Sequence, residues 1–66
     1  MSISENIKSA RKNAGLTQKQ LADAIGVYQK DVSRWERGER TPAADYIKKI
    51  CITLKVSADD LLEIKF

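Results

Sequence analysis

The stretch from Leu16 to Gly38, LTQKQLADAIGVYQKDVSRWERG, decides the fold, because its pattern predicts two short helices joined by a tight turn. Thr17 is a hydroxyl N-cap, and Gln20 can reach back to it from three residues on, which is a capping-box start. Gly26 ends the first helix, since the residue past a helix C-terminus often needs a positive φ. A second helix is predicted over about residues 29–37 and stops at the last glycine of the stretch.

This second helix has two different sides. Val32 and Trp35 lie three residues apart on one side, which predicts an apolar face packed into a core. Trp35 is therefore interpreted as a core anchor and not as a platform for a base. The opposite side carries side chains suited to base edges and phosphates: Gln29, Lys30, Ser33, Arg34 and Arg37. Such a helix fits the major groove of DNA.

A further helix is predicted before the stretch, from about Ser4 to Ala14, with Gly15 as its stop. Its apolar residues recur at the spacing of one buried stripe, namely Ile3, Ile7, Ala10 and Ala14. No part of the chain alternates with period two, so no sheet is expected. The predicted fold class is therefore all-α, a compact bundle of five short helices.

Two more helices are predicted after the stretch. Thr41 is the expected N-cap of the fourth helix, with Pro42 at its first position. Its buried stripe consists of Ile47, Ile50, Cys51 and Leu54, and Ile52 points away from that stripe. Ser57 and Asp60 form a second capping-box pattern, which opens a short helix that places Leu61 and Leu62 in the core.

Length and composition limit the class of protein. The 66 residues allow one domain, residues 1–66, and 42% hydrophobic with 32% charged residues is typical of a folded globular chain. No apolar run approaches the length of a membrane span, and the N-terminus lacks the apolar core of a signal peptide, so a cytoplasmic location away from membranes is expected. The net charge of +3 arises within residues 1–20 and favours an anionic partner.

The residue types needed for chemistry are missing. The sequence has one cysteine, Cys51, and no histidine, so metal sites and nucleophile–base pairs of the Cys-His or Ser-His kind are excluded. Cys51 is interpreted as a small buried hydrophobe. Asp59 and Asp60 are interpreted as the acidic first turn of a helix. We therefore expect no enzyme activity, no cofactor, no metal and no small-molecule ligand.

Three words of the sequence, GLTQKQLA, AIGV and VSRWERG, resemble the helix-turn-helix of lambda-type phage repressors and the wider Cro/C1 or Xre-like regulators. The helix-turn-helix covers about residues 17–37. The segments SISENIKSARKNAG and TPAADYIKKICITLKVSADDLL resemble the first, fourth and fifth helices of the same domain, so only residues 63–66 lie outside. The resemblance implies a sequence-specific, double-stranded DNA-binding transcriptional regulator, a repressor of phage, plasmid or bacterial origin.

The resemblance also implies roles for single residues. Gln29 takes the place of the leading base-contacting glutamine, and glutamine can pair with adenine N6 and N7. The implied base contacts are Gln29, Lys30, Ser33 and Arg34, and the implied backbone contacts are Gln18, Tyr28, Arg37 and Arg40. A charge-assisted, bidentate pair between Arg11 and Glu36 is implied to tie the first helix to the third.

Three positions depart from the family pattern. Tyr28 stands where a short Ser or Thr usually caps the recognition helix, so the cap is either weaker or supplied by Asp31, and the phenol is left to touch a phosphate or a thymine methyl group. Asp31 itself is expected near the groove edge, directed at a cytosine amino group or at Lys30 and Arg34. Lys55 stands at a turn where Gly or Asn is preferred.

A two-fold homodimer on a palindromic operator is implied by the family, with half-sites about one helical turn apart. Apolar residues left over in the C-terminal patch, residues 52–66, are the expected interface: Ile52, Ile64 and Phe66. In the alternative interpretation, the tail only closes the core. The alternative function is a protein-interaction adaptor that retains the fold without specific DNA binding, although the polar side of residues 29–37 lacks apolar anchors for a protein partner.

Overall fold

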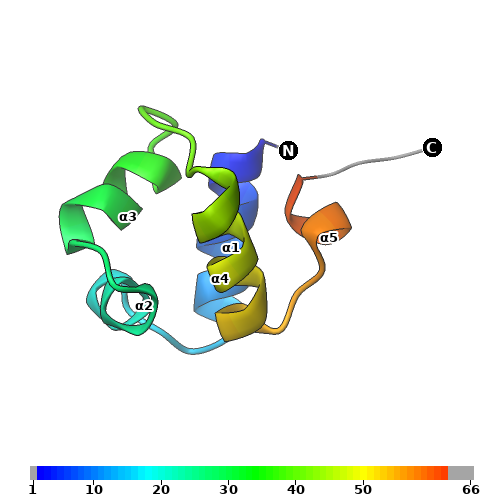
Figure 1. The fold of residues 1–66 in the computed structure, drawn as a ribbon, viewed down its shortest axis with the longest axis horizontal. Coiled ribbons are helices and arrows are strands. Elements are labelled where there is room, and N and C mark those ends of the chain that lie inside the picture. The colour runs from blue at the N-terminus through cyan, green and yellow to red at the C-terminus, as the bar shows by residue number, and fades with distance from the viewer. Residues whose placement is uncertain (1, 63–66) are drawn as a thin grey trace.

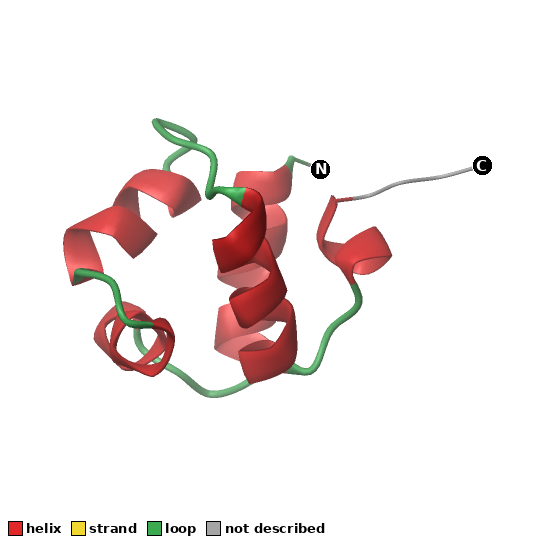
Figure 2. Cartoon of the chain, in the orientation of Figure 1, coloured by secondary structure: helices red, strands yellow, loops and turns green. Residues whose placement is uncertain are grey.

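The computed structural model describes residues 2–62, and within that range the chain forms five helices and no strand (Figure 1). The helices are α1 (Ile3–Asn13), α2 (Gln18–Ile25), α3 (Gln29–Glu36), α4 (Ala44–Leu54) and α5 (Ala58–Leu62). Short loops connect them (Figure 2). The predicted all-α fold class is confirmed. Among the described residues, no helix has the length and apolar character that crossing a membrane requires.

The helices pack in two groups around α1 and α4. In Figure 1, α4 lies in front of α1, with α2 and α3 on one side and α5 on the other. α2 packs against both α3 and α4, while α1 contacts α3 and α5. α3 is therefore supported from the inside by α1 and α2, and its other side remains open.

One apolar core joins all five helices. Its buried residues come from each element in turn: Ile7, Leu21, Ala22, Ile25, Val32, Trp35, Ile50, Leu54 and Leu61. Half-buried Tyr46 packs beside Trp35, with ring centroids 5.8 Å apart. Trp35 is thus a core anchor, as its spacing from Val32 predicted. Ile47 and Cys51 complete the predicted stripe of α4 as partly buried neighbours of this core.

The helix-turn-helix begins and ends its helices as predicted, to within one residue. The Thr17 hydroxyl accepts from the Gln20 backbone N–H at 3.0 Å, and the Gln20 side chain accepts from the Thr17 N–H at 2.8 Å. Gly26 follows α2 with φ 80°. α3 ends at Glu36, and Arg37, predicted as its last residue, is the C-cap.

α1 differs slightly from its prediction. It begins one residue earlier, at Ile3, because the Ser2 hydroxyl accepts from the Glu5 N–H and caps the helix. Ala14 is exposed, so its predicted place in the buried stripe is wrong. The reason is that α1 ends at Asn13, which leaves Ala14 as the C-cap outside the packed face.

The predicted start of α4 is wrong. Thr41 is not its cap and Pro42 is not its first residue, because the chain stays extended through Ala43, with φ −64° and ψ 160°. The Ala43 carbonyl accepts the first helical hydrogen bond, from Ile47 N at 3.0 Å. Pro42 is buried, so its ring packs against the protein two residues before the helix starts.

The join between α4 and α5 carries one confirmed and one corrected prediction. The Ser57 hydroxyl accepts from Asp60 N at 3.0 Å, which is the cap expected for α5. Leu61 is buried, but Leu62 remains 37% exposed, so the prediction that both leucines enter the core is wrong. Successive side chains of a helix point in different directions, and the packing of α5 against α1 and α4 turns Leu61, not Leu62, toward the core.

Candidate nucleic-acid interface

α3 presents its polar side to solvent because its apolar side is held by the core. Val32 and Trp35 are buried, whereas Gln29 and Lys30 are exposed and Ser33 and Arg34 are half-buried. The four side chains predicted to contact bases therefore lie on the free side of one helix. Their amide, ammonium, hydroxyl and guanidinium groups can donate to acceptors on base edges.

The start of α3 is capped without help from the side chain of Tyr28. The Tyr28 backbone N–H donates to Asp31 Oδ2 at 3.1 Å, whereas the Tyr28 side chain makes no cap hydrogen bond. Asp31 supplies the cap, as one of the two sequence-based alternatives proposed. This bond turns the Asp31 carboxylate toward the helix start, and the expected contacts with Lys30 or Arg34 are not formed within the described residues.

Tyr28 itself projects into solvent. The residue is 74% exposed, and Lys30 Nζ lies 5.5 Å from the centroid of its ring. A cation at this distance is attracted by the electron-rich face of the ring. The sequence analysis did not predict this pairing, although Tyr28 and Lys30 lie only two residues apart.

Arg11 and Glu36 form a buried ion pair beneath α3. Arg11 Nε lies 2.6 Å from Glu36 Oε2, and Arg11 Nη2 donates to Glu36 Oε1 at 3.0 Å. Only 10% of the Arg11 side chain and 3% of the Glu36 side chain are exposed. Arg11 Nη1 also donates to the Leu16 carbonyl at 2.8 Å. This is the bidentate pair that the resemblance implies, and it joins α1 to the end of α3.

Gln18 is a member of the same network, which the sequence did not predict. Its Nε2 donates to Glu36 Oε1 at 3.1 Å, so the side chain is directed toward α3. No local pattern could reveal this contact, because 18 residues separate the partners. Gln18 is also the first residue of α2, where backbone N–H groups lack helical partners and the helix dipole favours an anion.

Arg37 and Arg40 lie beyond the end of α3 and are both exposed. Arg37 donates to Glu39 and to the Ser33 hydroxyl, two contacts that the sequence analysis missed although Ser33 and Arg37 are four residues apart. The hydrogen bond between Arg37 and Glu39 lowers the pKa of the Glu39 carboxyl group and raises the pKa of the Arg37 guanidinium group. Arg40 lines a pocket of about 280 Å³ together with Asp31.

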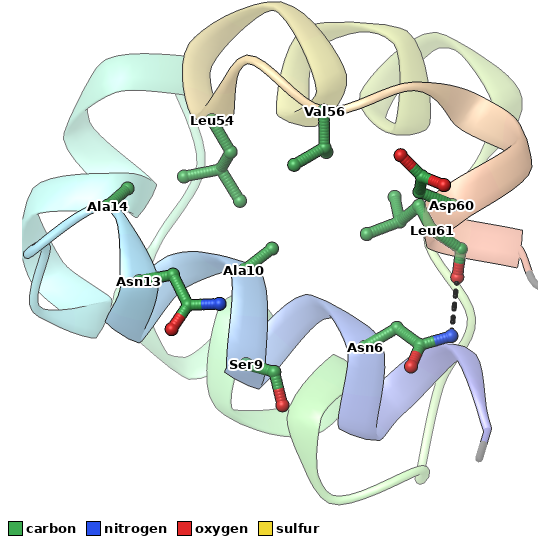
Figure 3. Close-up of a pocket in the computed structure, with 9 residues that line it drawn as sticks. All are labelled: Asn6, Ser9, Ala10, Asn13, Ala14, Leu54, Val56, Asp60 and Leu61. Atoms are coloured by element: carbon green, nitrogen blue, oxygen red, sulfur yellow. Dashed lines mark hydrogen bonds between the residues drawn. The ribbon is translucent and has the colours of Figure 1, made fainter.

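A second pocket lies between α1 and the α4–α5 turn (Figure 3). Its volume is about 280 Å³, and Leu54, Val56 and Leu61 form apolar walls. Asn6 at its edge is buried and donates from Nδ2 to the Leu61 carbonyl at 3.0 Å, drawn as a dashed line in Figure 3. This contact ties α5 to α1. Nothing in the sequence pattern distinguished Asn6 from a solvated amide.

Cys51 has the character of a small hydrophobe. It is partly buried against the core, and this burial raises the pKa of its thiol. The predicted dimer patch is described only in part. Ile52 is 69% exposed on α4, which agrees with its position off the buried stripe. Ile64 and Phe66, the other two residues of that prediction, lie outside the described residues.

Known proteins are similar to this chain in both sequence and fold. It is 37% identical over 94% of its length to the HTH-type transcriptional regulator ImmR of Bacillus subtilis, and 36% identical over 92% to the phage CTXphi transcriptional repressor RstR of Vibrio cholerae. These matches cover 49% of ImmR and 54% of RstR, so the chain spans about half the length of these curated relatives.

A solved structure agrees over nearly the whole chain. The P22 c2 repressor protein in complex with a synthetic operator superposes with a TM-score of 0.89, at 30% identity, and the match covers 96% of each chain. The family model described as Helix-turn-helix matches residues 7–61. This match spans α2 and α3 with the helices that support them. The chain belongs to the Cro/C1-type helix-turn-helix family, in the lambda-repressor-like fold.

Proposed function

We propose that this protein is a sequence-specific, double-stranded DNA-binding transcriptional regulator that acts as a repressor. The observation that carries the proposal is the free side of α3, where Gln29, Lys30, Ser33 and Arg34 lie on a helix fixed by the core on its other side. A helix of this kind can enter the major groove with its N-terminal residues at the base edges. The names of its relatives, transcriptional regulator and repressor, support the same role.

The contacts divide into two kinds. Gln29, at the first position of α3, would pair with adenine, and Lys30 or Arg34 would take guanine O6 and N7. Phosphates would be held by the N-terminus of α2 at Gln18 and by Arg37 and Arg40 beyond α3. Gln18 would use mainly its backbone N–H, since its side-chain amide already donates to Glu36. Arg37 would exchange its contact with Glu39 for a phosphate.

The protein would bind as a homodimer on a palindromic operator. One domain of 66 residues makes few base contacts, and two copies on half-sites about one helical turn apart double them. The exposed Ile52 on α4 supports an interface in the C-terminal patch, because an aliphatic residue that is 69% exposed is stabilised by being covered. Sedimentation of the purified protein at tens of micromolar, without DNA, tests this assignment, and purely monomeric behaviour would contradict a preformed dimer.

The experiment that tests the function is selection of randomised duplex DNA by the purified protein at two salt concentrations. An enriched palindrome is expected, since base contacts specify sequence whereas phosphate contacts do not. Gln29→Ala should relax the preference at one position per half-site, at about 1–3 kcal/mol of discrimination. Arg40→Ala should weaken all sequences alike and reduce the salt slope by about one unit.

Lys48→Ala is the matched control for Arg40→Ala, because Lys48 is an exposed cation on α4 that is not among the proposed DNA contacts. It should leave both affinity and sequence preference unchanged. Binding that is unselective and abolished by modest salt would mean that only a basic surface is at work. The adaptor function would then be preferred, and a protein partner would be sought.

A further inference from the structure

Tyr28 is an aromatic residue that the fold does not use for packing. Tyr28 is 74% exposed, whereas Trp35 is buried and half-buried Tyr46 packs against Trp35 at 5.8 Å between ring centroids. An exposed tyrosine beside α3 therefore needs a different explanation from the two aromatic residues that fill the core. The ring adds no core contact that a smaller residue would lose.

Capping does not explain Tyr28 either. Its backbone takes the extended conformation of an N-cap, with φ −84° and ψ 152°, but its side chain makes no cap hydrogen bond. The cap is supplied by Asp31, whose Oδ2 accepts from the Tyr28 N–H at 3.1 Å. This bond uses only the main chain of Tyr28, so another side chain at this position would preserve it.

The ring is nevertheless placed at the end of α3 that would meet the bases. Lys30 Nζ lies 5.5 Å from the ring centroid, and Lys30 is thereby drawn over the aromatic ring on the free side of the helix. Gln29, the residue between them, is exposed. In helix-turn-helix domains, the N-terminal residues of the second helix contact base edges.

We propose that Tyr28 is a specificity-determining residue that contacts the 5-methyl group of a thymine in the major groove through its ring. This inference rests on the proposed DNA-binding function. Among the four bases, thymine alone presents a methyl group in the major groove, and an aromatic ring offers this group an apolar contact. A phosphate contact, in contrast, would use the phenolic hydroxyl alone.

The two contacts are separated by removing one group at a time from each partner. The selected operator is made with each thymine in turn replaced by deoxyuridine, which deletes only the methyl group. Fluorescence anisotropy then gives the Kd of each duplex for the wild type, Tyr28→Phe and Tyr28→Ser. Serine is a good N-cap, so the Tyr28→Ser variant should fold, and its melting temperature checks this.

With wild-type protein, deoxyuridine at one thymine near the start of α3 should weaken binding about fourfold, the effect of uncovering one methyl-sized apolar group. Tyr28→Phe should keep this sensitivity and the affinity. Tyr28→Ser should bind the thymine and deoxyuridine operators equally well. Replacement of the other thymines by deoxyuridine, measured with the wild-type protein, serves as the internal control.

Three results would overturn the proposal. Tyr28→Phe could lose affinity on all duplexes alike, which would assign the hydroxyl to a phosphate. Tyr28→Ser could keep the full sensitivity to deoxyuridine, or no thymine could be sensitive in the wild type. These results differ from failure of the proposed function, in which the wild type itself would select no operator.

Discussion

The helix-turn-helix and the segment after it differ in the residue types found where their helices begin and end. α2 begins with a reciprocal cap between Thr17 and Gln20 and is followed by Gly26 in the left-handed region. α4 begins at Ala44, its N-cap Ala43 offers no side-chain hydrogen bond, and it is followed by Lys55, also in the left-handed region at φ 58°. Residue types that favour the local backbone thus mark the ends of α2, whereas α4 lacks them at both ends.

This difference indicates where each part of the chain obtains its stability. α2 and α3 must hold a fixed angle if a helix is to be presented to a groove, and local hydrogen bonds supply that geometry in addition to the core. α4 depends mainly on tertiary packing, because Ile50 and Leu54 are buried although its ends are unfavourable. Substitutions that remove the hydrogen bonds of the helix-turn-helix should therefore lower the free energy of unfolding. Substitutions that place favourable residues at the ends of α4 should raise it.

The largest effect is expected where the helix-turn-helix is tied to α1. Arg11→Ala would leave the carboxylate of Glu36 without its charged partner, in a side chain that is 3% exposed and accepts hydrogen bonds from both Arg11 and Gln18. Removing one partner of a buried ion pair costs about 3–5 kcal/mol. Urea denaturation should show a loss of this size in the free energy of unfolding.

The matched control for Arg11→Ala is Lys12→Ala, which removes the same charge from an exposed neighbour. Its free energy of unfolding should change by no more than about 0.5 kcal/mol. Equal stability of the two variants would contradict the structural role of the pair and would mean that Arg11 acts only as a surface charge.

The sequence predicted these features unequally, and the reason is the range over which each signal acts. Thr17, Gln20 and Gly26 were read correctly, because capping and positive φ are determined within a few residues. Gln18 was assigned to a phosphate, and its bond to Glu36 was missed, because that contact depends on how α2 packs against α3. The apolar spacing of α3 fixed its inner side and, by exclusion, the side chains on its outer side.

The second prediction tests the reciprocal cap of α2. Thr17→Ala removes the hydroxyl that accepts from Gln20 N at 3.0 Å and should lower the free energy of unfolding by about 1–2 kcal/mol. Thr41→Ala is the matched control, since Thr41 is exposed and lies outside α4. Thermal denaturation should show a lower melting temperature for Thr17→Ala and an unchanged one for Thr41→Ala. A similar loss for Thr41→Ala would revive the predicted but unobserved cap of α4.

The errors in the later segment follow from weak local signals. Thr41 and Pro42 match a common helix start, but burial of Pro42 in the fold keeps the chain extended for two more residues. Leu61 and Leu62 are both apolar, and only the packing of α5 against α1 determines which of them is buried. Tertiary contacts determine the start of α4 and the burial of Leu61, and the local sequence pattern does not reveal those contacts.

The third prediction supplies the cap that α4 lacks. Ala43→Ser would place a hydroxyl at the N-cap, where the backbone already has the extended conformation of a cap. The free energy of unfolding should rise by up to about 1 kcal/mol. Ala44→Ser, one residue inside the helix, is the control and should not stabilise. A gain from Ala44→Ser instead would mean that the helix starts one residue later than the structure places it.

The smallest effect is expected at the other end of α4. Lys55 is the only residue other than glycine with a positive φ among residues 2–62, and a side chain in this conformation costs roughly 1–2 kcal/mol. Lys55→Gly removes that cost but adds about 0.4–1 kcal/mol of conformational entropy to the unfolded chain, so a net gain of about 0.5 kcal/mol is expected. Lys55→Ala is the decisive control, since it removes the charge and keeps the Cβ. If Lys55→Ala stabilises as much as Lys55→Gly in urea denaturation, charge and not backbone conformation limits this turn.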